Sequence, residues 1–414
     1  MEMMSKPQDV GLSSMRLARI RPWIQGYLDA GKLPGATILV ARHGKAVFCD
    51  SFGFRDLEAQ QPMTADAILR FYSMTKPITA VALMMLYEQG LFQLDTPVAE
   101  FIPSFKDARV YVSGEDADMV TEPQNNPMTL HHLLTHTSGL TYGFGNAGLI
   151  PELYQARHTD FEPHDGPLKE VVDRLAQIPL EFQPGQRWNY GVSFDVLGRV
   201  VEVVSGKSLD TYFKEHIFEP LGMKDTGFAV PKDKLDRFAA LYERTDENDL
   251  TLLEAPQTSA LIDTVGTFSG GGGLVSTLGD YFRFTEMLRC KGELDGTRLL
   301  GRKTVEYMTA NHLPGDLAEL GQPTFNETTY EGIGFGLGVS VMLNPAKAKV
   351  MGTPGEYAWG GYAGTAFRID PREDMTVIFL TQLIPSSAYP IRREQRVLTY
   401  QALIDQKLSQ KYLL

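Results

Sequence analysis

The sequence predicts an α/β fold of the α+β type, in which an antiparallel sheet is built from both ends of the chain and flanked by helices. Strand-like segments occur near the start and in the last third of the 414 residues, whereas residues 95–206 carry few strand signals and many Pro and Gly breaks. No repeat of fixed period occurs, which excludes solenoids and propellers. We expect residues 1–95 and 200–414 to form the domain that holds the sheet, and residues 96–199 to form a mostly helical insertion.

The N-terminal elements are a helix and a hairpin. Apolar residues recur at helical spacing over residues 18–28, and Gly31 ends this helix. Two strands follow, at residues 36–41 and 46–52, and the turn residues 43–45 join them. This hairpin is the N-terminal contribution to the predicted sheet.

A strongly apolar helix is predicted over residues 73–89, with Gly90 as its stop. Its most apolar stretch, residues 78–86, is about half the length of a membrane span and indicates a buried helix. Further helical patterns follow at residues 130–136, 168–177, 193–204 and 209–217.

The last third of the chain returns to strands and ends in a helix. The β-like segments lie at residues 336–342, 356–360, 364–369 and 375–380. The final helix is predicted over residues 391–407. Residues 308–330, with their Pro, Gly and acidic residues, are expected to form a long irregular loop, and such loops in compact enzymes often serve as lids.

Composition and charge exclude several classes of function. The net charge of −12 and the pI near 5.2 argue against a general nucleic-acid or anionic-membrane binder. Two cysteines, Cys49 and Cys290, are too few for a disulfide framework and indicate a reducing compartment. The first 15 residues lack the apolar run of a signal peptide, so we expect a cytoplasmic protein with no nucleic-acid or membrane partner.

The sharpest local motif is Ser73-x-x-Lys76 at the start of the apolar helix. This spacing places a hydroxyl and an amine on neighbouring turns of one helical face. A partly buried amine there could accept a proton from the serine, and the helix N-terminus favours negative charge. About one such tetrapeptide is expected by chance in a chain of this length, so Ser73 could also merely cap the helix while Lys76 is solvated.

Further motifs follow Ser73-x-x-Lys76 in a fixed order, namely the segments 130–140 (LHHLLTHTSGL), 188–193 (WNYGVS), 270–277 (GGGGLVST) and 359–361 (WGG). In this order they resemble the serine β-lactamase and penicillin-binding-protein superfamily. Within it, the chain is most similar to the β-lactamase-like carboxylesterases (family VIII esterases) and to a related acyltransferase, simvastatin synthase. The resemblance covers nearly the whole chain and implies a β-lactamase/transpeptidase-like fold.

The resemblance also implies catalytic roles. Ser73 matches the acylated nucleophile, Lys76 the adjacent base, and Tyr190 the tyrosine that moves protons between nucleophile and leaving group. The backbone N–H groups of Ser73 and Tyr362 match the oxyanion hole. No metal and no organic cofactor are implied. The alternative for Tyr190 is a partly buried ring whose hydroxyl bonds to backbone, which is the common fate of tyrosine.

Two departures from the family pattern bear on the substrate. Trp359-Gly360-Gly361 stands where penicillin-recognising relatives have Lys-Thr-Gly, so the cation that would bind a substrate carboxylate is replaced by an apolar wall. Val192 stands where asparagine is usual. Both changes favour uncharged esters over β-lactams. We expect the substrate to contact Trp359, Gly360, Gly361 and Tyr142.

Competing motifs are weaker. His132 and His136 would share a helical face and, with His131, could suggest a metal site, but Leu133 stands where a zinc motif carries glutamate. The run Gly270–Gly273 lacks the Gly-Lys-Ser/Thr end of a phosphate-binding loop, and no Gly-x-Ser-x-Gly sequence occurs.

We therefore expect a serine carboxylesterase that hydrolyses small to medium esters through an acyl-enzyme. Three alternatives stay open: an acyltransferase of the same mechanism, a weak β-lactamase or peptidase, and a non-catalytic binding homologue. The expected partner is a small-molecule ester, and the sequence leaves the oligomeric state open.

Overall fold

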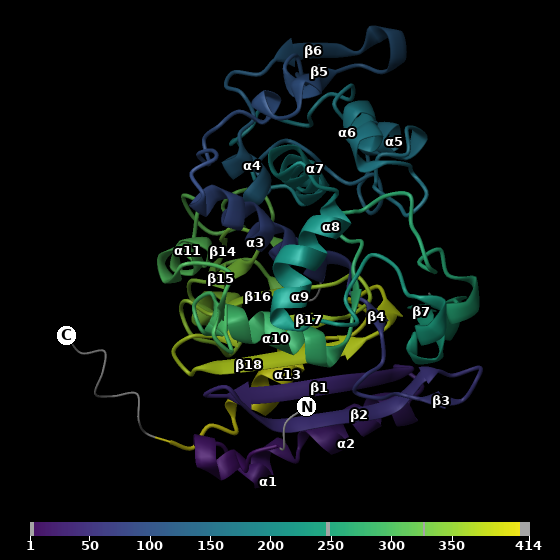
Figure 1. Ribbon diagram of the computed structural model, residues 1–414, viewed down its shortest axis with the longest axis vertical. Helices are drawn as coiled ribbons and strands as arrows, with labels where there is room; N and C mark the ends of the chain where they lie inside the picture. Colours follow the sequence, from purple (N-terminus) through teal and green to yellow (C-terminus); the bar gives the residue numbers. More distant parts are fainter. Residues whose placement is uncertain (1–3, 246–248, 326–327, 406–414) are drawn as a thin grey trace, which may run out of the picture.

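The computed structural model describes residues 4–245, 249–325 and 328–405. Its largest sheet has eight antiparallel strands drawn from both ends of the chain, which confirms the predicted fold class (Figure 1). From one edge to the other, the strands are β14 (Ile333–Phe335), β15 (Ser340–Met342), β16 (Tyr357–Gly360), β17 (Ala366–Asp370), β18 (Met375–Thr381), β1 (Gly35–Arg42), β2 (Lys45–Asp56) and β3 (Gln61–Pro62).

Both faces of this sheet are buried under helices. Because side chains alternate between faces along a strand, Leu39 and Ile378 lie in one apolar cluster, and Ile38 and Val377 lie in the other. The first cluster is shared with α3 and α10, the second with α2 and α13. The bounds of these helices are α2 (Ile20–Asp29), α3 (Thr75–Glu88), α10 (Leu278–Arg289) and α13 (Ile391–Tyr400). Trp359 belongs to the first cluster, so it lies on the α3 face of the sheet.

Helix α3 is buried on nearly all sides, as its continuous apolar sequence predicts. The structure places Ser73 in a 3-10 turn, Tyr72–Met74, that leads into α3, and not within the helix itself. Tyr72 has φ +44°, a left-handed conformation that is uncommon for a residue with a bulky side chain. Gly90 follows the helix with φ +73°, in agreement with the predicted stop.

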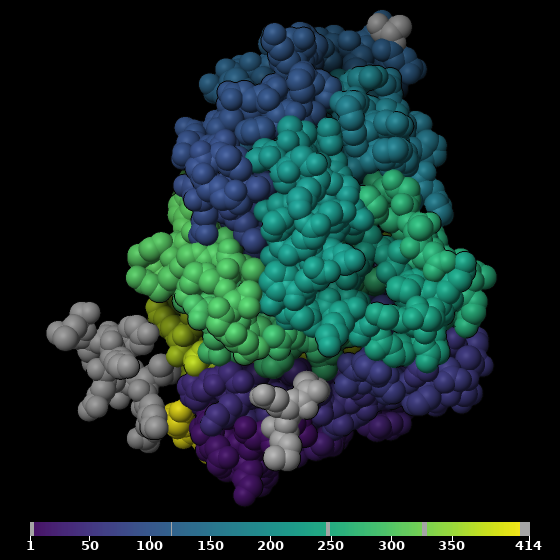
Figure 2. All heavy atoms as spheres, viewed as in Figure 1, coloured from purple at the N-terminus to yellow at the C-terminus, as the bar shows by residue number. Residues whose placement is uncertain are grey.

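The middle of the chain contains the predicted helices, and also one helix, over residues 149–156, and one hairpin that were not predicted. The helices are α4 (Leu130–Leu134), α5 (Leu149–Ala156), α6 (Leu168–Leu175), α7 (Ser193–Ser205) and α8 (Leu209–Phe213). The hairpin pairs β5 (Arg109–Ser113) with β6 (Val120–Pro123) and lies at the end of the molecule remote from β1 and β2 (Figure 1). In the space-filling view, these blue and teal segments pack directly on the green ones (Figure 2). The domain boundaries at residues 95 and 200 stay a prediction.

Two predicted elements differ in the structure. Residues 336–342 were expected to form one strand, but the chain turns there and forms the hairpin β14–β15 instead. Gly338 has φ +89°, which lets the chain reverse at a point where apolar neighbours on both sides suggest a continuous strand. Helix α13 ends at Tyr400, residues 401–405 are not helical, and the rest of the predicted helix lies outside the described residues.

The remaining elements are short and complete the fold: α1 (Ser14–Leu17), β4 (Leu69–Arg70), α9 (Glu219–Leu221), β7 (Leu241–Arg244), β8 (Leu250–Glu254), β9 (Val275–Ser276), β10 (Glu293–Leu294), β11 (Thr297–Arg298), α11 (Arg302–Met308), β12 (Thr324–Phe325), β13 (Thr328–Thr329), α12 (Pro345–Ala348) and β19 (Leu383–Ile384). Within the described ranges, no helix combines the length and the apolar character that crossing a membrane requires. Cys49 and Cys290 are free thiols.

Candidate active site

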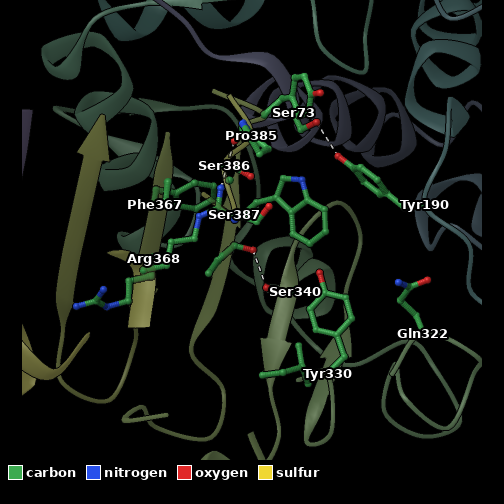
Figure 3. A pocket seen from close by; sticks show the side chains of 18 of the residues that line it. Ser73, Tyr190, Gln322, Tyr330, Ser340, Phe367, Arg368, Pro385, Ser386 and Ser387 are labelled. Carbon is green, nitrogen blue, oxygen red and sulfur yellow. Dashed lines mark hydrogen bonds between the residues drawn. The ribbon is translucent and has the colours of Figure 1, made fainter. Parts of the chain in front are cut away.

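Ser73, Lys76 and Tyr190 meet at one point, although Tyr190 lies 117 positions beyond Ser73 in the sequence. The hydroxyl of Tyr190 donates to Ser73 Oγ at 2.6 Å (Figure 3). Lys76 Nζ lies 3.1 Å from the same oxygen. Ser73 comes from the turn before α3, Lys76 from the first turn of α3, and Tyr190 from the loop before α7. The sequence predicted this set of three residues, and the structure brings their reactive atoms within hydrogen-bond distance.

Lys76 is fully buried, which is rare for a lysine and requires that its amine be well satisfied. Besides Ser73, it donates to the hydroxyl of Tyr142 and to the carbonyl oxygen of Gly271, both at 2.8 Å. The ring of Tyr190 lies 4.6 Å from Nζ and adds a cation–π contact. Tyr142, which was predicted to line the substrate pocket, therefore also holds Lys76. Burial raises the pKa of Tyr142 well above its ordinary value, so its hydroxyl keeps its proton.

Asp195 is a site residue that the sequence analysis missed. It lies in the first turn of α7, is almost fully buried, and its Oδ1 accepts hydrogen bonds from Ser269 Oγ at 2.5 Å and from the Gly271 N–H at 3.0 Å. Burial raises the pKa of Asp195 to about 6, and the positive charge of Lys76 acts in the opposite direction. A Cβ on Gly271 would lie 2.3 Å from Asp195 Oδ2. Asp195 thus fixes the glycine loop whose carbonyl oxygen binds Lys76, and this contact explains the glycine run better than phosphate binding does.

The three histidines of the metal hypothesis do not converge. His131 Nε2 lies 3.2 Å from His312 Nδ1, and His132 Nδ1 accepts a backbone hydrogen bond at the N-terminus of α4. His136 is fully buried among aromatic rings, and neither of its ring nitrogens has a hydrogen-bond partner among the described residues. Burial lowers the pKa of His136 well below its ordinary value, so the ring stays neutral. Over the ranges that the structure covers, no group of three metal-ligating side chains is found.

The edge of β16 approaches the turn that carries Ser73 very closely. A Cβ on Gly361 would lie 2.3 Å from the carbonyl oxygen of Phe71, so only glycine fits here without displacement. Edge-to-face contact between the rings of Tyr72 and Tyr362, with centroids 6.0 Å apart, joins the same two segments. The segments that carry the backbone N–H groups of Ser73 and Tyr362 are therefore direct neighbours.

A cavity of about 530 Å³ opens beside Ser73 (Figure 3). Of the residues predicted for the site, those that line this cavity are Ser73, Tyr142, Tyr190, Trp359, Gly360, Gly361 and Tyr362. Gln322 and Tyr330, from the predicted lid segment, also line it, while the role of that segment as a lid stays a prediction. Trp188 and Phe335 are core residues, and their rings pack against those of Tyr190 and Trp359, respectively.

The opposite end of the cavity is polar and was not predicted from the sequence. Ser386 and Ser387 follow β19, and Arg392, Gln395 and Arg396 lie on α13. These side chains surround the cavity from the face of the sheet opposite α3. The sequence did not identify these residues as part of the site, because α13 has the pattern of an ordinary amphipathic helix.

Comparisons with known proteins identify the family of the chain. A family model described as Beta-lactamase matches residues 20–401. The chain is 35% identical over 370 residues to Protein Rv1367c of Mycobacterium tuberculosis, with 87% of this chain and 89% of that protein covered. It is 32% identical over 381 residues to Esterase EstB of Burkholderia gladioli, with 88% of this chain and 90% of that protein covered.

Solved structures show the same fold. EstCE1, described as a hydrolase with promiscuous acyltransferase activity, has a TM-score of 0.80 and 28% identity, with 93% of this chain and 99% of that chain covered. Simvastatin synthase (LovD) of Aspergillus terreus has a TM-score of 0.78 and 25% identity, with 94% of this chain and 98% of that chain covered. The resemblance inferred from the motifs is confirmed, and the chain belongs to the Beta-lactamase family.

Proposed function

We propose that the protein is a serine carboxylesterase that hydrolyses small to medium uncharged esters through an acyl-enzyme on Ser73. The observation that carries this proposal is the position of Ser73 Oγ, which lies at the cavity within hydrogen-bond distance of both Lys76 Nζ and the Tyr190 hydroxyl. A serine needs such a neighbouring base to act as a nucleophile. The relative named Esterase EstB supports the same reaction class.

In the acylation step, Lys76, assisted by Tyr190, takes the proton from Ser73 Oγ as this oxygen attacks the ester carbonyl carbon. The carbonyl oxygen becomes an oxyanion and is held by the backbone N–H groups of Ser73 and Tyr362. Tyr190 then donates a proton to the alkoxide leaving group, the C–O bond breaks, and the alcohol departs. The acyl group stays on Ser73 as an ester.

Deacylation reverses these roles with water in place of the alcohol. Tyr190 accepts a proton from the water, whose oxygen attacks the acyl carbon, and Ser73 Oγ leaves with a proton returned through Lys76 or Tyr190. The hydrogen bonds from Lys76 to Tyr142 and Gly271 keep its amine aimed at Ser73 in both steps. No metal or organic cofactor takes part in this scheme.

The cavity wall beside Ser73 favours uncharged esters. Trp359 is 8% exposed and packs its ring 5.6 Å from that of Tyr190, so it presents an apolar surface beside the nucleophile. The rings of Phe144 and Tyr142 pack with their centroids 4.6 Å apart and extend this surface. An apolar wall of this kind gains from contact with an acyl chain and offers no partner to a carboxylate.

A second candidate is acyl transfer to a bound alcohol. It uses the same acyl-enzyme and differs only in which hydroxyl compound Tyr190 activates, and the description of EstCE1 supports it. Activity on β-lactams is less favoured, because Trp359 and Val192 occupy positions at which penicillin-recognising relatives carry polar residues.

One assay distinguishes these functions. We expect p-nitrophenyl acetate and butyrate to be hydrolysed, and a nitrocefin sample in the same panel to be turned over slowly or not at all. Added methanol should divert part of the acyl group to a methyl ester, and the ratio of methyl ester to acid measures transferase against esterase activity. Rapid nitrocefin turnover with inert esters would overturn the esterase proposal.

A further inference from the structure

The carbonyl oxygen of Gly361 is held from behind the sheet by an arginine. Arg392, in the first turn of α13, donates from Nη2 to the carbonyl oxygens of Gly361 at 3.2 Å and Thr365 at 3.4 Å. It reaches them along Gly360, where a Cβ would lie 2.6 Å from the same nitrogen. Gly360 and Trp359 face opposite sides of β16, so Arg392 approaches from the side away from Tyr190.

The carbonyl that Arg392 binds belongs to the same peptide unit as the N–H of Tyr362. Ile384–Pro385 is the one cis peptide bond found among the described residues, so the Gly361–Tyr362 unit is trans. In a planar trans peptide, the C=O and N–H bonds point in opposite directions. The Gly364 N–H also donates to Gly361 O, at 3.2 Å. Holding this oxygen on the α13 side therefore turns the Tyr362 N–H away from α13.

Arg392 brings a positive charge as well as a hydrogen bond. Arg396, one turn later in α13, is paired with Glu356 at 2.5 Å, whereas the hydrogen bonds of Arg392 go to carbonyl oxygens. The Nε of Arg392 is buried and has no hydrogen-bond partner among the residues that the structure describes. A cation at a carbonyl oxygen polarises the amide and makes its N–H a stronger donor, most of all in a medium of low dielectric constant.

We propose that Arg392 is a positioning residue that orients and polarises the Gly361–Tyr362 peptide, so that the Tyr362 N–H stabilises the oxyanion formed on Ser73. This inference rests on the proposed esterase mechanism, in which that N–H is one of two oxyanion donors. It also places a cation near the reacting carbonyl in a chain where Trp359 replaces the lysine of penicillin-recognising relatives. The charge acts through the strand from the far face of the sheet, and Trp359 keeps the α3 side of β16 apolar.

The test compares Arg392→Gln, Arg392→Lys and a matched control, Arg393→Gln, with the wild-type protein. Arg393 is the next residue of α13 but is exposed, and its Nη2 donates to Lys349 O. With p-nitrophenyl butyrate, we expect Arg392→Gln to lower kcat about ten- to a hundredfold and to change KM less than about twofold. Arg392→Lys keeps the charge and should recover most of kcat, and Arg393→Gln should match the wild type.

Phenylboronic acid provides a second readout, because its adduct with Ser73 places an oxygen at the oxyanion position. Its affinity should fall in Arg392→Gln in parallel with kcat. Unchanged kcat and boronate affinity in a folded Arg392→Gln protein would overturn the inference. A KM increase confined to esters that carry a carboxylate, with kcat for neutral esters unchanged, would also overturn it and would assign Arg392 to substrate binding. If Ser73→Ala retained full activity, the esterase mechanism itself would fail, which is a different outcome.

Discussion

Replacing Ser73 by alanine is expected to lower kcat for p-nitrophenyl butyrate hydrolysis by about 10⁴-fold or more. The reason is that Ser73 Oγ is the protein atom that forms the bond to the acyl carbon in the proposed scheme. The variant loses the hydrogen bonds that Ser73 Oγ accepts from the Tyr190 hydroxyl and from Lys76 Nζ, and we expect its thermal unfolding midpoint to shift by only a few degrees. Steady-state kinetics together with circular dichroism measure both effects.

The matched control is Ser205→Ala. Ser205 is also partly buried and hydrogen-bonded, but it lies at the C-terminal end of α7, where its Oγ accepts from the Lys207 N–H at 3.2 Å. We expect this variant to keep wild-type kinetics. Comparable activity in Ser73→Ala and Ser205→Ala would contradict the assignment of the nucleophile.

Replacing Tyr190 by phenylalanine is expected to lower kcat by about 10²- to 10⁴-fold, because the change removes the acid that protonates the leaving alcohol. The ring itself should stay in place. It stacks on Trp188 with 14° between the ring planes and lies 4.8 Å from the His136 ring, and these contacts do not need the hydroxyl. KM should change little, since the ester gains the interaction with the phenol only during reaction.

Tyr142→Phe is the informative comparison for Tyr190→Phe. Both rings lie near Lys76 Nζ, but the Tyr142 hydroxyl accepts a hydrogen bond from this amine, whereas the Tyr190 hydroxyl donates to Ser73 Oγ. We therefore expect Tyr142→Phe to lose about tenfold in kcat, through poorer alignment of Lys76. A loss in Tyr142→Phe as large as that in Tyr190→Phe would contradict the separate roles given to the two phenols.

Elements with strong local patterns could be predicted from the sequence. The hairpin β1–β2 and the strand β18 stand out as short apolar runs bounded by turn residues, and in the sheet they are neighbours, with Leu39 opposite Ile378. The prediction of one strand over residues 336–342 was wrong, because Gly338 reverses the chain between two apolar segments that pair with each other as β14 and β15. The register of distant strands depends on tertiary packing, which local patterns do not encode.

The candidate site likewise contains some residues that could be predicted from the sequence and others that could not. Ser73 and Lys76 form a local motif, and Tyr190 could be added through the family resemblance. Asp195 meets Gly271 across 76 positions, and Arg392 meets Gly361 across 31 positions. Neither pair has a sequence signature, because each acts by holding a backbone group that another residue uses. Residues that hold a backbone group in this way can be identified only from the hydrogen bonds of the three-dimensional structure.

The most direct test of the account is detection of the acyl-enzyme. The protein is mixed with p-nitrophenyl trimethylacetate, whose bulky acyl group should slow deacylation, quenched in acid, and examined by intact-mass spectrometry and peptide mapping. The account predicts one added trimethylacetyl group, located on the peptide that contains Ser73, and no adduct in Ser73→Ala. An acyl group found on a different residue, or an unchanged adduct in Ser73→Ala, would contradict it.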